Sequence, residues 1–191
     1  MSNITKRYRR GLCTAIVGLM GLMGCTATNS VESPAKDDVT ILKFANEGVI
    51  LAKTSTLSKM ISADVGGSLS FLFPHGSTSE DAVLSVTLTV PPQSLSQDSE
   101  ISLSFDGQSL DFEFEPDGTY FSTPARLDVD AKGVDLAGVN SENVSLFYSN
   151  QAEQNWEPMP TDSVTIIENT GHLRLVNATI PHFSRYVLAE E

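Results

Sequence analysis

The sequence predicts an all-β protein: an antiparallel β-sandwich that follows an export leader and a flexible tether. Apolar side chains alternate with hydroxyl-bearing ones along many short segments, which is the period of a strand. Turn-forming residues recur roughly every ten residues between these segments, a spacing typical of sandwiches. No segment shows a convincing helical stripe of apolar residues. About eight to ten short strands are expected, enough for two packed sheets.

The chain begins with an export signal. Basic residues at positions 6 to 10 precede an apolar run from Gly11 to Gly24, which ends in Leu22-Met23-Gly24-Cys25. A run of about 14 residues is too short to span a bilayer, which needs roughly 20. The last four residues resemble the lipobox of bacterial lipoproteins, in which a peptidase cuts before a lipid-modified Cys. The resemblance implies that Cys25 becomes the first mature residue and carries acyl chains such as palmitate.

Charge and cysteine content narrow the partners of such a protein. The four basic residues of the leader leave with it and no acidic residue does, so the net charge falls from -12 to -16. Nucleic acid and anionic lipid surfaces are poor partners for this charge. Cys13 leaves with the leader and Cys25 receives lipid, so no disulfide is expected. Thr26 stands where an Asp would resemble an inner-membrane retention signal, which points to the outer membrane of a bacterial envelope.

Three parts are predicted along the chain: a leader over 1–24, the lipidated Cys and tether over 25–57, and a sandwich over 58–191. Residues Thr26 to Lys36 have almost nothing to bury, as expected of a flexible tether. Residues Val39 to Thr56 are compatible with a strand or with a short amphipathic segment.

Alternation marks the expected strands and the direction of their side chains. Pro91-Pro92 ends one strand, because neither residue donates to a ladder. Asp106-Gly107 and Asn169-Thr170-Gly171 predict hairpin turns. The strand segments are 69–73, 84–90, 101–105, 110–114, 127–129, 144–148, 164–166, 173–175 and 186–188. The phase of alternation turns five phenyl rings into the core: Phe71, Phe73, Phe105, Phe112 and Phe114.

Particular residues also resemble those of a known family. The segments are Val86 to Leu95, Phe114 to Phe121, Pro124 to Leu127, Trp156 to Pro158 and His182 to Tyr186. Together they resemble the ZU-five domain of ankyrins, zonula occludens proteins and netrin receptors, and especially its bacterial relatives on secreted and lipid-anchored proteins. The match covers about Ser58 to Leu188, with Gln93-Ser94 where the family often has Gly-Ala. The resemblance implies a non-enzymatic, cofactor-free module that binds another protein or contributes to a surface assembly.

His182-Phe183-Ser184 permits two interpretations. In some relatives, and in one nucleoporin, this motif cuts its own chain between Phe and Ser. The resemblance then makes Ser184 the nucleophile and His182 the base, and the chemistry needs a strained peptide bond. In the other interpretation Phe183 packs in the core, His182 and Ser184 satisfy backbone groups, and Tyr186 anchors the corner by its hydroxyl.

Metal binding is not predicted. Asp128 to Gly133 begins like an EF-hand loop, but Lys132 and Val139 stand where oxygen ligands belong. A stripe of four carboxylates is interpreted as a solvated strand face that guards against edge pairing. It comprises Asp111, Glu113, Glu115 and Asp117. The three histidines are far apart in sequence: His75, His172 and His182.

Sugar binding is a third hypothesis, since secreted sandwiches often bind glycans through exposed aromatic rings. Only Tyr120, Phe121 and Trp156 fall outside the inward phase, and core packing is the favoured interpretation of Trp156. No G-x-S-x-G elbow marks a hydrolase. A protein-binding module, a self-cleaving module and a carbohydrate-binding module therefore stay open.

Overall fold

A computed structural model describes residues 39–45, 55–75, 82–150 and 155–191. The predicted leader, Cys25 and the segment Thr26 to Lys36 lie outside these residues. Within the described ranges, the chain forms strands and two short 3-10 turns, η2 (Ser141–Asn143) and η3 (Glu168–Thr170). No helix in this part is long and apolar enough to cross a membrane.

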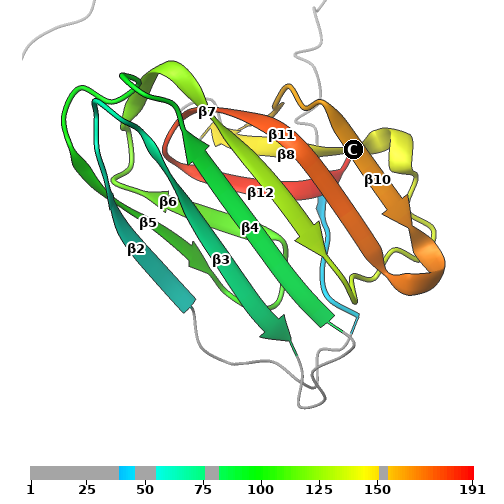
Figure 1. Ribbon diagram of the computed structural model, residues 1–191. Helices are drawn as coiled ribbons and strands as arrows, with labels where there is room; N and C mark the ends of the chain where they lie inside the picture. Colours follow the sequence, from blue (N-terminus) through cyan, green and yellow to red (C-terminus); the bar gives the residue numbers. More distant parts are fainter. Residues whose placement is uncertain (1–38, 46–54, 76–81, 151–154) are drawn as a thin grey trace, which may run out of the picture. The chain divides into compact units, whose positions relative to one another are not determined.

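The strands form two antiparallel sheets, one packed on the other (Figure 1). The seven-stranded sheet consists of β2 (Ser55–Ile61), β5 (Ser99–Phe105), β6 (Asp111–Glu115), β12 (Arg185–Glu190), β8 (Val144–Asn150) and β9 (Asn155–Pro158), with β1 (Thr40–Ile41) on β12. The five-stranded sheet, in front in Figure 1, consists of β10 (Ser163–Ile167), β11 (His172–His182), β7 (Tyr120–Ala131), β4 (Ala82–Val90) and β3 (Gly67–His75). The predicted antiparallel β-sandwich is confirmed.

The core lies between the sheets and contains the predicted phenyl rings. Phe71, the most exposed of the five, is only 9% exposed, and Phe112 and Phe114 are fully buried. Phe105 joins rings from both sheets, since its centroid lies 5.7 Å from Phe73 and 5.9 Å from Phe112. Burying each of these side chains contributes roughly 1.5–3 kcal/mol, so the inward phase of the strands is the main source of stability.

The predicted turns also form. β4 ends at Val90, directly before the two prolines, and β5 pairs with β6 across Asp106-Gly107. β10 pairs with β11 across η3 and Gly171. Gln93 has a φ of 60°, in the left-handed region, which explains why a glycine would suit this corner.

The sandwich also includes residues before Ser58. β1 pairs with the end of β12, and the Leu42 amide donates to the Leu188 carbonyl at 3.0 Å. Leu42 and Phe44 are buried in the core, and Phe44 meets Phe105 edge-on at 6.2 Å. Part of the ambiguous segment 39–56 is thus a short strand of the sandwich, and β2 begins at Ser55.

Candidate functional site

The predicted His-Phe-Ser motif lies where the chain crosses from one sheet to the other. His182 ends β11 in the five-stranded sheet, Arg185 begins β12 in the seven-stranded sheet, and Phe183 and Ser184 join them. We call His182 to Tyr186 the corner. Its backbone is fixed by the turn between β6 and β7. The Phe183 amide donates to the Thr119 carbonyl at 2.9 Å, and the Gly118 amide donates to the Phe183 carbonyl at 3.0 Å.

The apolar and phenolic side chains of the corner are buried. Phe183 is fully buried, with its ring stacked 5.9 Å from Phe114 and edge-on to Phe121 at 4.8 Å. The Tyr186 hydroxyl donates to the His182 carbonyl at 2.7 Å, and burial raises the Tyr186 pKa well above its ordinary value. The predicted packing of Phe183 and the predicted Tyr186 anchor are confirmed.

Ser184 and His182 have different partners. The Ser184 carbonyl accepts from the Phe114 amide at 3.0 Å, and its side chain lies near enough to the phenol of Tyr148 to lower the pKa of that group. His182 Nδ1 lies 3.3 Å from the carbonyl oxygen of Phe183. In the described corner the two side chains share no hydrogen bond, so a direct proton transfer from Ser184 to His182 would need one of them to move.

Three rings meet beside the corner, and we call Tyr120, His182 and Tyr148 the aromatic group. Tyr120 begins β7 and pairs in register with His182. The ring centroids of Tyr120 and His182 lie 5.1 Å apart, and those of His182 and Tyr148 lie 4.7 Å apart at 83°. His182 and Tyr148 are half-buried, whereas Tyr120 is 75% exposed. The aromatic group therefore has one exposed ring, Tyr120, next to the half-buried rings of His182 and Tyr148.

Two acidic residues, Glu157 and Asp117, lie near this group. Burial is the main cause of the raised pKa of Tyr148, and Tyr120, Glu157 and Asp117 raise it further, while the hydrogen bond with Ser184 lowers it. Glu157 on β9 lies opposite Tyr148 in register. Its carboxylate accepts a hydrogen bond from the side-chain amide of Asn150 at 2.7 Å. The raised pKa keeps the Tyr148 phenol neutral near pH 7.

Trp156 belongs to a separate cluster. It is half-buried against Phe147, Val187 and Ala189, which form a small cluster apart from the main core. The guanidinium of Arg185 lies 5.8 Å from the Trp156 ring centroid. The two residues named for sugar binding, Tyr120 and Trp156, thus contact different groups of side chains.

Three of the carboxylates considered for calcium are engaged with protein groups: Asp111, Asp128 and Asp130. Asp128 and Asp130 lie within β7 and not in a loop. Asp128 accepts from the Asn177 amide at 2.9 Å, and Asp130 lies 3.0 Å from His172 Nε2. Asp111 of the acidic stripe binds Arg185, with a shortest distance of 2.6 Å. Among the described residues, no three His, Cys, Asp or Glu side chains gather as metal ligands.

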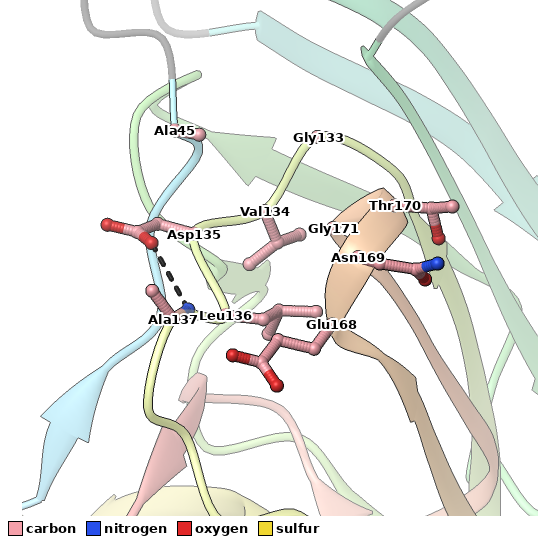
Figure 2. Close-up of a pocket in the computed structure, with 10 residues that line it drawn as sticks. All are labelled: Ala45, Gly133, Val134, Asp135, Leu136, Ala137, Glu168, Asn169, Thr170 and Gly171. Carbon is pink, nitrogen blue, oxygen red and sulfur yellow. Dashed lines mark hydrogen bonds between the residues drawn. The ribbon is translucent and has the colours of Figure 1, made fainter.

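An open pocket of about 530 Å³ lies at the loop after β7 (Figure 2). Buried Val134 and Leu136 line it, together with η3 and Gly171. Its two carboxylates accept hydrogen bonds from backbone amides of the loop after β7. Asp135 accepts from the Ala137 amide at 3.3 Å, and Glu168 accepts from the Gly138 amide at 3.4 Å. Nothing in this lining gathers a nucleophile and a base, so the aromatic group is the stronger candidate site.

Comparisons with known proteins add no evidence on function, which therefore comes from the fold and this site. No protein-family model, curated protein or solved structure matches the chain. Sequence reasoning named His182, Ser184 and Tyr120, placed Asp117 in the acidic stripe, and gave Tyr148 and Glu157 no role in a site. Tyr148 alternates like any core residue of its strand. Its contact with His182 depends on the pairing of β8 with β12, which no local pattern reveals.

Proposed function

We propose that this protein is a non-enzymatic lipoprotein of the bacterial envelope, of ZU-five-like type, whose sandwich binds another protein. Lipid on Cys25 would anchor it, because two or more acyl chains hold a protein firmly at a membrane. The outer membrane is the proposed site, as the residue after Cys25 favours it. Both parts of the proposal begin from the leader and the family resemblance.

The single observation that carries the binding role is the exposure of Tyr120. A tyrosine that is 75% exposed, yet backed by the rings of His182 and Tyr148, offers a large and rigid contact area. Tyrosine is enriched among the residues that dominate binding energies at protein interfaces. Ordering such a ring costs little conformational entropy because its neighbours already restrict it.

Crosslinking and capture from intact envelopes tests this function. The full chain, Tyr120→Ala and Leu72→Ala are compared, because Leu72 is 71% exposed on β3 and serves as a matched surface control. We expect a partner to be retained by the native chain and by Leu72→Ala, and about tenfold less by Tyr120→Ala, as for an interface hot spot. Capture that is unchanged in Tyr120→Ala would remove the aromatic group from the proposal.

Self-cleavage between Phe183 and Ser184 is the second hypothesis. Its supporting feature is the Phe183 carbonyl, which accepts from the Gly118 amide at 3.0 Å and lies close to His182 Nδ1. Donors in such positions stabilise an oxyanion when a hydroxyl attacks. Intact mass decides it: cleavage releases residues 184 to 191, and Ser184→Ala abolishes the fragment. We expect a single uncut mass for both chains, because His182 Nδ1 lies beside the Phe183 carbonyl and shares no hydrogen bond with Ser184 in the described corner.

A carbohydrate-binding module is the third hypothesis, and the arrangement of the two aromatic residues favours it least. The Trp156 ring lies against an apolar cluster with Arg185 nearby, so only Tyr120 offers an open face.

A further inference from the structure

The aromatic group and its carboxylates form a receptor for a cation, and we propose that it binds a lysine side chain of the partner protein. The inference rests on the proposed function and names the chemistry of that contact. Three features carry it: the geometry of the rings, the sign of the surrounding charge, and the place where the chain enters the sandwich.

Ring geometry provides the attractive surface. Tyrosine ring faces carry negative electrostatic potential and attract ammonium groups placed within about 6 Å of the ring centroid. Tyr120 is held by its backbone pairing with His182 and by the ring contact at 5.1 Å. The ring of Tyr148 follows at 4.7 Å from His182. A ligand side chain that reaches Tyr120 thus meets a ring whose position the strands fix.

The charges beside the rings have the complementary sign. Asp117 is exposed in the turn that leads to Tyr120, and Glu157 lies opposite Tyr148 and is oriented by Asn150. Both carboxylates act electrostatically on Tyr148. The cation of the corner is already engaged, because Arg185 makes a two-pronged contact with Asp111 at 2.6 and 3.0 Å. The whole chain, at a net charge of -12, also favours basic partners.

The chain enters the sandwich away from these rings. β12 begins at Arg185, beside the aromatic group, and ends at Glu190, where it pairs with Thr40 of β1. Six strand residues extend roughly 20 Å. The described chain thus joins the sandwich at the end of β12 that is opposite the aromatic group.

Binding of a fluorescein-labelled lysine-containing peptide tests the inference. The full chain is studied in an uncharged maltoside detergent at low ionic strength, by fluorescence anisotropy. The same peptide with acetylated lysines is the ligand control, because acetylation removes the charge and keeps the chain length. We expect acetylation to weaken binding at least fivefold. Tyr120→Leu should weaken it about two- to fivefold, and Tyr120→Phe should bind as the native chain does.

Two charge variants distinguish binding at this site from nonspecific attraction to the acidic protein. Asp117→Asn should weaken binding about two- to fivefold at low salt, and less at high salt. Asp64→Asn changes a carboxylate that is also exposed, in the turn between β2 and β3, and should leave binding unchanged. Equal losses in both variants, native binding in Tyr120→Leu, or equal affinity for the acetylated peptide would overturn the inference. Tyr120-dependent capture of a partner without lysine binding would leave the proposed function standing and remove only the lysine contact.

Discussion

At the scale of single residues, the corner shows how one motif satisfies its polar groups while it turns the chain. Phe183 fills the core, the Ser184 carbonyl accepts from the Phe114 amide, and the Tyr186 hydroxyl donates to the His182 carbonyl. Each buried polar group would cost about 1–3 kcal/mol if left without a partner. The corner is therefore a structural element first, and the exposed ring of Tyr120 beside it is available for contact with another molecule.

Tyr186→Phe tests the anchor. The change removes the 2.7 Å hydrogen bond to the His182 carbonyl, so we expect a loss of about 1–2 kcal/mol in unfolding free energy near pH 7. The pKa of Tyr186 is higher in the folded state than its ordinary value of 10.0, so the unfolded chain loses its proton first and stability falls above pH 10. The stability of Tyr186→Phe should fall less steeply above pH 10 than that of the native chain. Denaturant unfolding from pH 7 to 11, followed by Trp156 fluorescence, measures both effects, and parallel pH profiles would contradict the assignment.

At the scale of elements, turns set which strands become neighbours, and glycine allows two of the tightest ones. Gly66 joins β2 to β3 with a φ of 71°, and Gly118 precedes β7 with a φ of 75°. A Cβ at Gly66 would lie 2.4 Å from the Val90 carbonyl oxygen, whereas at Gly118 nothing lies within 4 Å. The two positions share a backbone conformation and differ in the space around it.

Gly66→Ala and Gly118→Ala separate these two contributions. Both variants place an L-residue in the left-handed region, which costs about 1 kcal/mol. Gly66→Ala should lose at least about 2 kcal/mol more, because backbone atoms would have to move away from the added methyl group. Chemical denaturation of both variants provides the comparison. Equal losses of unfolding free energy in the two variants would contradict the predicted clash at Gly66.

At the scale of the whole molecule, the described residues form one sandwich in which the first and last strands meet. β1 pairs with β12, so the point where the chain arrives from its N-terminal part is fixed beside its last residues. Leu42 and Phe44, which follow β1, are both buried, so apolar packing supports this pairing.

Cys25→Ala tests the anchor itself. The proposed lipobox requires the thiol, so the variant should keep its leader and carry no lipid, while the native chain should lose residues 1 to 24 and gain acyl mass. Intact mass and membrane fractionation distinguish the two. A variant that is processed and retained at the membrane like the native chain would end the lipoprotein proposal.

The sequence by itself determined the fold class, most strands and the direction of their rings. Alternation is a local property, since successive side chains point to opposite faces whatever the partner strand is. It therefore predicted that Phe112 and Phe114 lie inside, and it predicted the hairpin at Asp106-Gly107. The order of basic residues, apolar run and lipobox-like residues in the leader is equally local, and it supplied the anchor hypothesis.

Only the tertiary structure decided which distant residues meet. It placed Thr40 beside Glu190, Glu157 opposite Tyr148, and the Ser184 carbonyl on the Phe114 amide. These contacts depend on register between segments far apart in the chain, and a shift of one residue would turn each side chain to the other face. No local period carries that information, so the aromatic group emerged only when both sheets were in place.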